Sequence, residues 1–107
     1  MNQNQYIQAV LRAYLQSPET TLRPRPADRK LAASLYHRRV PLQDVLGAIL
    51  LATARRLFRP PPPLPPIRSL HYFLPVIDEI QGIDPGYLEF LEYKLRHRCP
   101  AYRPLRD

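Results

Sequence analysis

The placement of its fourteen prolines limits this 107-residue chain more than any other feature of the sequence. Proline lacks a backbone N–H and its ring clashes with the preceding turn, so it interrupts helix interiors and central strands alike. Six prolines stand within 60–66, and most of the others flank stretches with the apolar spacing of helices. The prolines therefore divide the chain into short segments, each of which must form its own element.

Between the prolines, apolar residues recur three and four positions apart, which is the spacing of one buried helix face. The sequence has no alternating run of Val, Ile and Thr and no hairpin-type turn dipeptide, so nothing favours a strand. We predict an all-α fold, a compact bundle of about five helices. The expected bounds are Asn4–Gln16, Ala27–Arg38, Pro41–Phe58, a helix capped by Ser69 that runs to Gln81, and a helix capped by Asp84 that runs to His97.

Two of these helices carry features that predict how they pack. Pro41–Phe58 is apolar around most of its circumference, which is typical of the central helix of a bundle. Its small residues, Gly47 among them, favour a close approach of neighbouring helices. In the fourth helix, Pro75 removes a hydrogen bond to the carbonyl of His71, so we predict a kink there.

The run Pro60–Pro66 is expected to be a polyproline II connector between the third and fourth helices, because dense proline favours that conformation. The run also satisfies two SH3-type ligand patterns, one that begins at Arg59 and one that ends at Arg68. Such patterns arise easily in this composition, so a rigid spacer is the favoured interpretation. We expect residues 1–98 to form a single helical domain and 99–107 a loose C-terminal tail.

The positive charge is concentrated in the middle of the chain. The formal net charge is +7, and residues 28–59 alone carry seven basic and two acidic side chains. Such a concentration attracts phosphate backbones or acidic protein surfaces. A second explanation is compositional, because Arg and Pro are both frequent and both have GC-rich codons. If nucleic acid binds, the expected backbone contacts are Arg29, Lys30, Arg38, Arg39, Arg55, Arg56, Arg59 and Arg68.

The second and third helices have the layout of a helix-turn-helix, which would predict base recognition in a DNA groove. A recognition helix presents polar side chains to base edges from its N-terminal half. Here that half offers only Gln43, Asp44 and Gly47 between aliphatic residues, and Asp44 would be repelled by phosphate. A helical hairpin within the bundle is therefore favoured over a base-reading motif.

Two tyrosines lie close to arginines, a combination that stacks on the bases of single strands. Tyr36 precedes Arg38 and Arg39, and Tyr72 lies near Arg68. Both tyrosines also belong to apolar helix faces, where a tyrosine is more often a core residue with its hydroxyl at the edge. We therefore favour core positions for both.

No arrangement of side chains predicts catalysis or a metal site. His97 and Cys99 form a possible ligand pair, but structural zinc needs four ligands, and Arg96 and Arg98 would oppose a cation. The chain has three glycines, widely separated, so no glycine-rich phosphate loop is present. Cys99 is the sole cysteine, so no internal disulfide can form. We expect no enzyme, no cofactor and no small-molecule substrate.

The chain also has no feature that predicts a membrane location. Its N-terminal residues are polar and uncharged, unlike the basic start of a secretory signal. The longest apolar run, Ala48–Ala52, is far shorter than the ~20 residues that span a bilayer. We expect a cytoplasmic protein without a membrane partner.

Three runs of sequence carry a resemblance to known proteins. They are Leu42 and Val45 after Val40-Pro41, then Leu50-Leu51-Ala52-Thr53-Ala54-Arg55-Arg56, and Pro65-Pro66-Ile67-Arg68-Ser69-Leu70-His71-Tyr72-Phe73-Leu74-Pro75-Val76-Ile77. Through them Leu35–Ile80 resembles uncharacterised small helical proteins and domains associated with bacterial mobile elements and replication-initiation proteins. Where that pattern has a glycine before Val40, this chain has Arg39. The resemblance implies a prokaryotic, nucleic-acid-linked setting and supplies no site residue.

The charge and the resemblance together predict a nucleic-acid-associated accessory protein of a bacterial mobile-element or replication system. It would bind DNA or RNA through backbone contacts with little sequence preference. The alternative is a protein–protein interaction module that packs an apolar helix face on a partner or in a homodimer. That alternative rests on the third helix, whose apolar surface exceeds what four small helices are expected to cover.

Overall fold

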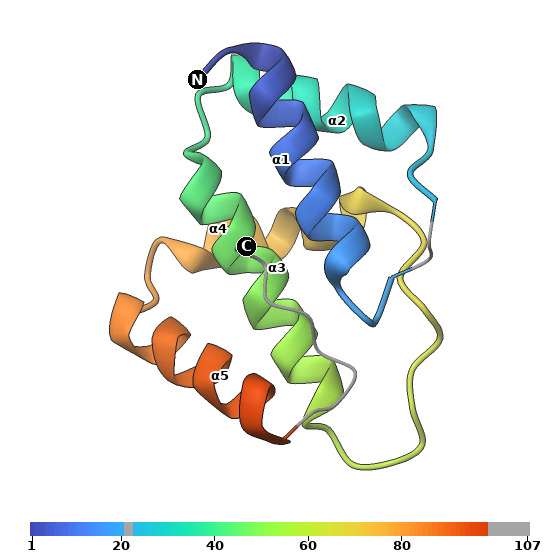
Figure 1. Cartoon of the computed structure of the whole chain (residues 1–107), viewed down its shortest axis with the longest axis vertical. Coiled ribbons are helices and arrows are strands. Elements are labelled where there is room, and N and C mark those ends of the chain that lie inside the picture. The colour runs from blue at the N-terminus through green and yellow to red at the C-terminus, as the bar shows by residue number, and fades with distance from the viewer. Residues whose placement is uncertain (21–22, 99–107) are drawn as a thin grey trace.

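The computed structural model describes residues 1–20 and 23–98, which contain five α-helices and one 3-10 helix (Figure 1). The helices are α1 (Gln3–Gln16), α2 (Pro26–His37), α3 (Leu42–Leu57), the 3-10 helix η1 (Leu70–Phe73), α4 (Leu74–Ile80) and α5 (Pro85–Arg98). Within the described ranges there is no strand, and a single bridge pairs Thr20 with Ile67. The predicted all-α bundle is confirmed. The tail predicted at 99–107 lies outside the described residues.

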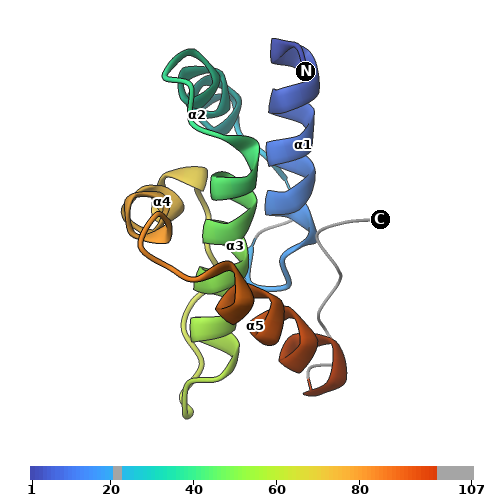
Figure 2. The same ribbon diagram turned by 90° about the vertical axis from the view of Figure 1, so that its left-hand side faces the viewer.

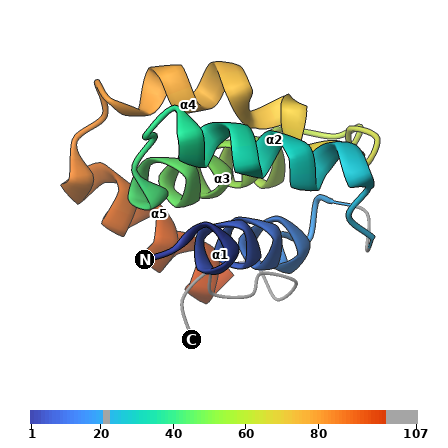
Figure 3. The ribbon, with the colours of Figure 1, turned by 90° about the horizontal axis from the view of Figure 1, so that it is seen from above.

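The helix α3 is the centre of the bundle, as its all-round apolar character predicts. Figures 2 and 3 show α1 and α4 on opposite sides of α3, and both helices contact it. The helix α5 crosses α3 near the end of the molecule that lies away from α2 (Figure 2). The helix α2 packs mainly against α1 and η1. No helix among the described residues has the length and apolar content needed to cross a bilayer.

Two clusters of buried side chains hold these helices together. The larger one joins α1, α2, α3, η1 and α4, and at its centre the rings of Tyr14 and Phe73 meet edge to face at 6.1 Å. The smaller one joins α5 to α3 and α4. A Cβ added at Gly47 would lie 3.2 Å from Ile80 and 3.3 Å from Leu88. The close helix approach predicted at Gly47 is therefore present.

The helices α1 and α2 each start one residue earlier than predicted, and α3 starts one residue later. Asn2 caps α1: its Oδ1 accepts from the backbone N–H of Gln5 at 2.8 Å, and the Gln5 side chain accepts from the N–H of Asn2 at 3.0 Å. This reciprocal pair satisfies two N–H groups that have no partner within the helix. The helix α2 starts at Pro26, and Pro41 precedes α3 as its cap residue.

The kink predicted at Pro75 is wrong. The segment after Ser69 first forms η1, and α4 begins afresh at Leu74, so Pro75 stands in the first turn of α4. N–H groups in a first turn have no partner within the helix, so proline loses nothing there. Ser69 is a cap as predicted, and its Oγ accepts from the N–H of His71 at 3.2 Å.

The proline-rich run connects α3 to η1 along the outside of the bundle (Figure 1). Residues 60–66 are all exposed, and Ile67 returns to the core, where its N–H donates to the carbonyl of Glu19 at 2.7 Å. The run therefore links two elements of one core. Its polyproline II conformation stays a prediction.

Candidate nucleic-acid interface

The helix α2 presents only positive charge to solvent, because its one carboxylate points inward. Asp28 has no exposed surface. Its Oδ1 accepts from the backbone N–H of Leu70 at 2.9 Å, and its Oδ2 accepts from the backbone N–H of Arg25 at 2.8 Å. Buried carboxylates need such partners, and two backbone donors satisfy this one. Every exposed side chain with a formal charge between 23 and 39 is therefore a cation.

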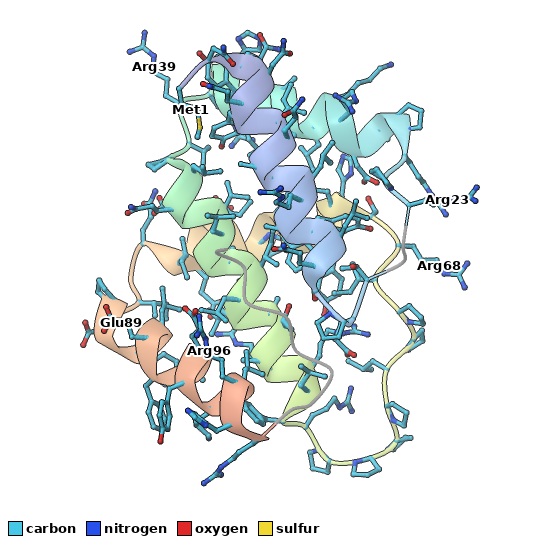
Figure 4. All side chains as sticks on the ribbon, in the orientation of Figure 1. Met1, Arg23, Arg39, Arg68, Glu89 and Arg96 are labelled. Carbon is cyan, nitrogen blue, oxygen red and sulfur yellow. The ribbon has the colours of Figure 1, made fainter. Side chains whose placement is uncertain are left out.

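Six exposed cations on and beside α2 form a surface that we call the α2 basic face. Its members are Arg23, Arg25, Arg29, Lys30, Arg38 and Arg39. Twelve helical residues at 1.5 Å each give this surface a length of about 18 Å. Figure 4 shows Arg39 at one end of α2 and Arg23 near the other. None of the ion pairs formed within residues 1–20 and 23–98 involves these six side chains.

Arg68 extends this surface at the Arg23 end. It follows Ile67, whose bridge to Thr20 brings the connector beside the chain that leads into α2. Figure 4 shows the side chains of Arg23 and Arg68 projecting from the same edge of the molecule. At the other end, Asp78 of α4 lines a surface hollow with Arg38 and Arg39. The positive charge is therefore least opposed from Arg23 to Lys30.

Arg55 is one of the nucleic-acid contacts predicted from the sequence. In the structure it forms an ion pair. Both of its terminal nitrogens donate to the carboxylate of Glu79 on α4, one of them at 2.9 Å and the other more closely. The hydrogen bond with Arg55 lowers the pKa of Glu79, and the same bond raises the pKa of Arg55. This pairing neutralises the charge of Arg55 locally, so little positive charge remains to attract a phosphate.

Arg56 is directed into the protein, so it does not form part of an outer surface. Its side chain is 6% exposed, and its Nε donates to Oε1 of Glu19 at 3.0 Å. Its other nitrogens donate to the hydroxyl of Tyr72 and to the carbonyl of Pro65. Burial lowers the pKa of Arg56, but the hydrogen bonds with Tyr72 and Glu19 raise it, and the net shift is upward. Arg56 joins the loop after α1 to the proline-rich connector.

The predicted nucleic-acid contacts thus divide into those that lie on or beside α2 and those that lie elsewhere. Arg29, Lys30, Arg38 and Arg39 are all exposed and belong to the α2 basic face. Arg59 is exposed but follows α3, whose end lies at the far side of the molecule from α2 (Figure 1). Sequence reasoning omitted Arg23 and Arg25 from the contacts. The signal for including them was available, because no carboxylate stands between 20 and 27 to pair with them.

The two tyrosines near arginines occupy different environments. Tyr36 is half-buried, and its ring meets that of Tyr6 edge to face at 5.4 Å. Tyr72 is 43% exposed, and the guanidinium of Arg56 lies 5.5 Å from its ring centroid. The core position favoured for Tyr72 is therefore wrong. Its ring covers Arg56, an inward-facing partner that the sequence did not indicate.

The helix α3 is not placed to read bases. Of its N-terminal residues 42–47, only Gln43 is exposed, and Val45 and Gly47 are buried. The rest of α3 lies against α1, α4 and α5. A helix covered in this way cannot enter a groove without unfolding the bundle, so any contact with nucleic acid must come from other elements.

A second exposed surface lies on α5 and was not indicated by the sequence. Tyr87, Phe90 and Tyr93 are 48%, 54% and 62% exposed. Nζ of Lys94 lies 4.7 Å from the ring centroid of Phe58 and 5.4 Å from that of Phe90. We call Phe58, Tyr87, Phe90 and Tyr93 the α5 aromatic face.

In the part of the chain that the structure describes, no group of three His, Cys, Asp or Glu side chains gathers to hold a metal ion.

Comparison with known proteins adds no relative to this description. No protein-family model, no curated protein and no solved structure matches the chain.

Proposed function

We propose that this protein binds DNA or RNA through phosphate contacts made by the α2 basic face, as an accessory protein of a bacterial mobile-element or replication system. The observation that supports the binding is the inward position of Asp28, which leaves six exposed cations without an ion-pair partner among the described residues. The resemblance of Leu35–Ile80 to proteins of such systems supports the setting.

The proposed mode of binding follows from the residue types on this face. Five of its six cations are arginines, whose planar guanidinium groups donate two parallel hydrogen bonds to a phosphate. Contacts of this kind release counterions from the nucleic acid and depend steeply on salt. They carry no sequence information. Because α3 is covered, we expect binding with little sequence preference.

Fluorescence anisotropy with labelled duplex and single-stranded oligonucleotides at two salt concentrations tests this proposal. Six phosphate contacts predict a loss of affinity of roughly 10³-fold between 50 and 200 mM salt. Absence of binding at low salt, or an affinity that ignores salt, would contradict the proposal.

We propose a self-association or protein-docking role as the second candidate, on a different surface from the one that the sequence suggested. Most of the apolar surface of α3 lies inside the bundle, so it offers a partner less than the sequence suggested. The α5 aromatic face supports this candidate instead, because exposed Tyr and Phe are enriched in protein interfaces. Light scattering on the purified protein and on a Phe90→Ser variant tests it. A dimer that Phe90→Ser dissociates would support self-association, whereas a monomer at all concentrations would exclude it.

A further inference from the structure

Arg39 has a backbone conformation that normally requires glycine. Its φ is 61°, and no other non-glycine residue of the described chain has a positive φ. It ends α2 in a tight turn in which the N–H of Arg39 donates to the carbonyl of Tyr36 at 3.0 Å and that of Val40 to the carbonyl of Leu35 at 3.1 Å. Helix ends of this kind strongly favour glycine, because a Cβ is strained there. The chain keeps an arginine in spite of that strain.

The strained arginine lines an aromatic groove at the end of the α2 basic face. The groove has a volume of about 620 Å³, and its walls include Tyr36, His37, Arg39, Pro41, Leu42 and Met1. None of the residues that line it is a carboxylate. Tyr6 supports the wall, since its hydroxyl donates to the carbonyl of Val40 at 2.8 Å and its ring contacts that of Tyr36.

This combination matches the chemistry of an unpaired nucleobase with its phosphate. Aromatic and apolar walls stack on the faces of a base, and a neighbouring arginine binds the attached phosphate or stacks on the base. Figure 4 shows the side chain of Arg39 extending outward from the corner of the molecule, near Met1. A chain of phosphates that lies along the α2 basic face would therefore bring its next base to this groove.

We propose that the groove binds a base of single-stranded nucleic acid, with Tyr36 as the stacking residue and Arg39 as the cation that fixes the adjacent phosphate. The proposal rests on the proposed function and specifies its substrate, single strands over duplex. Bases of a duplex are stacked inside the helix and do not reach such a groove without leaving the stack. Residues with a strained backbone cluster at binding and catalytic sites, which agrees with a binding role for Arg39 beside this groove.

Fluorescence anisotropy with a labelled single strand and with a duplex of the same length, at one low salt concentration, tests the inference. We expect the single strand to bind about tenfold more tightly, in line with one stacked base. Tyr36→Leu should abolish this preference and leave duplex affinity unchanged, and Tyr36→Phe should retain it. Arg39→Gly should reduce the preference. An oligonucleotide carrying one 2-aminopurine should lose fluorescence on binding to the wild type and not on binding to Tyr36→Leu.

The outcomes separate this inference from the proposed function. Equal affinity for both strands, or a preference that survives Tyr36→Leu, would overturn the groove assignment and leave phosphate binding intact. If the wild type bound neither oligonucleotide, both proposals would be overturned. The same would follow if an Arg29→Gln/Lys30→Gln variant bound oligonucleotides with the full affinity of the wild type. Should Tyr36→Leu fail to fold, Arg39→Gly decides the question. Glycine suits this backbone position, so an unchanged single-strand preference in that variant would overturn the proposal.

Discussion

The carboxylate of Asp28 accepts a hydrogen bond from the backbone N–H of Leu70 at 2.9 Å, across 42 positions of the chain. Its second oxygen accepts from the N–H of Arg25. One buried side chain thereby ties α2 to η1 and also removes the only carboxylate from the outer side of α2. The inward position of Asp28 therefore accounts both for the attachment of α2 to η1 and for the positive charge of its outer side.

Replacement of Asp28 by asparagine should destabilise the protein. Asparagine has one acceptor oxygen where aspartate has two, and its amide group would face a backbone donor in a buried site. We expect a loss of about 1–3 kcal/mol in the free energy of unfolding, measured by urea denaturation. Asp78→Asn, at an exposed position of α4, is the control and should change stability little. Equal stability of the two variants would show that the Asp28 contacts do not hold α2 to η1.

Loss of the Arg56 guanidinium should destabilise the link between the loop after α1 and the connector. Arg56→Met keeps the packing of the stem but leaves Glu19 and the carbonyl of Pro65 without their donor. We expect a loss of about 2 kcal/mol, again by urea denaturation. Arg59→Met removes the same charge from an exposed position and should be close to neutral. An unaltered midpoint for Arg56→Met would contradict the structural role of this arginine.

The ion pair of Arg55 with Glu79 predicts a pH dependence of stability. The hydrogen bond with Arg55 holds the pKa of Glu79 below its ordinary value in the folded protein. The stabilisation is therefore complete above the unfolded pKa and is lost as the pH falls below about 4. The melting temperature of Glu79→Gln should lie below that of the wild type at pH 7, and the difference should vanish in acid. The control, Glu89→Gln, should show no such difference. If the melting temperature of Glu79→Gln stayed below that of the wild type in acid, the ion pair would not be the cause of the difference.

Arg39→Gly should raise stability, in contrast to most substitutions. Glycine adopts the positive φ of this position without a clash, and relief of that strain is worth about 1 kcal/mol. For a domain of this size, the melting temperature should rise by about 4 °C. Arg38→Gly is the matched control: Arg38 has a φ of −79°, so glycine gains nothing there and adds entropy to the unfolded chain. A lower melting temperature for Arg39→Gly would contradict the strain.

Features that depend on neighbours in the sequence could be predicted, and those that depend on distant partners could not. The apolar spacing of α3 and the prolines between elements are local, and they were enough to indicate an all-α bundle around a central helix. Arg55 and Arg56 are adjacent and look equivalent in the sequence. Their carboxylate partners stand 24 and 37 positions away, so only the fold shows that both are neutralised.

Pro75 illustrates the same limit within one segment. Its sequence neighbours are compatible both with a continuous helix kinked at the proline and with a new helix that begins beside it. The burial of Leu70 and Phe73 in the larger core cluster accompanies a 3-10 turn there, and α4 then starts at Leu74. Such a choice depends on packing and not on local preference.

We propose that the phosphate contacts come from the α2 basic face and not from the basic residues of the chain in general. The most direct test is the salt dependence of oligonucleotide affinity for three proteins: the wild type, Arg29→Gln/Lys30→Gln, and Arg55→Gln/Arg96→Gln. Both variants lose two charges, but Arg55 and Arg96 are paired with Glu79 and Glu92. We predict that the α2 variant lowers the slope of log affinity against log salt by about 2, and that the control leaves it unchanged. Equal slopes for the two variants would contradict the account.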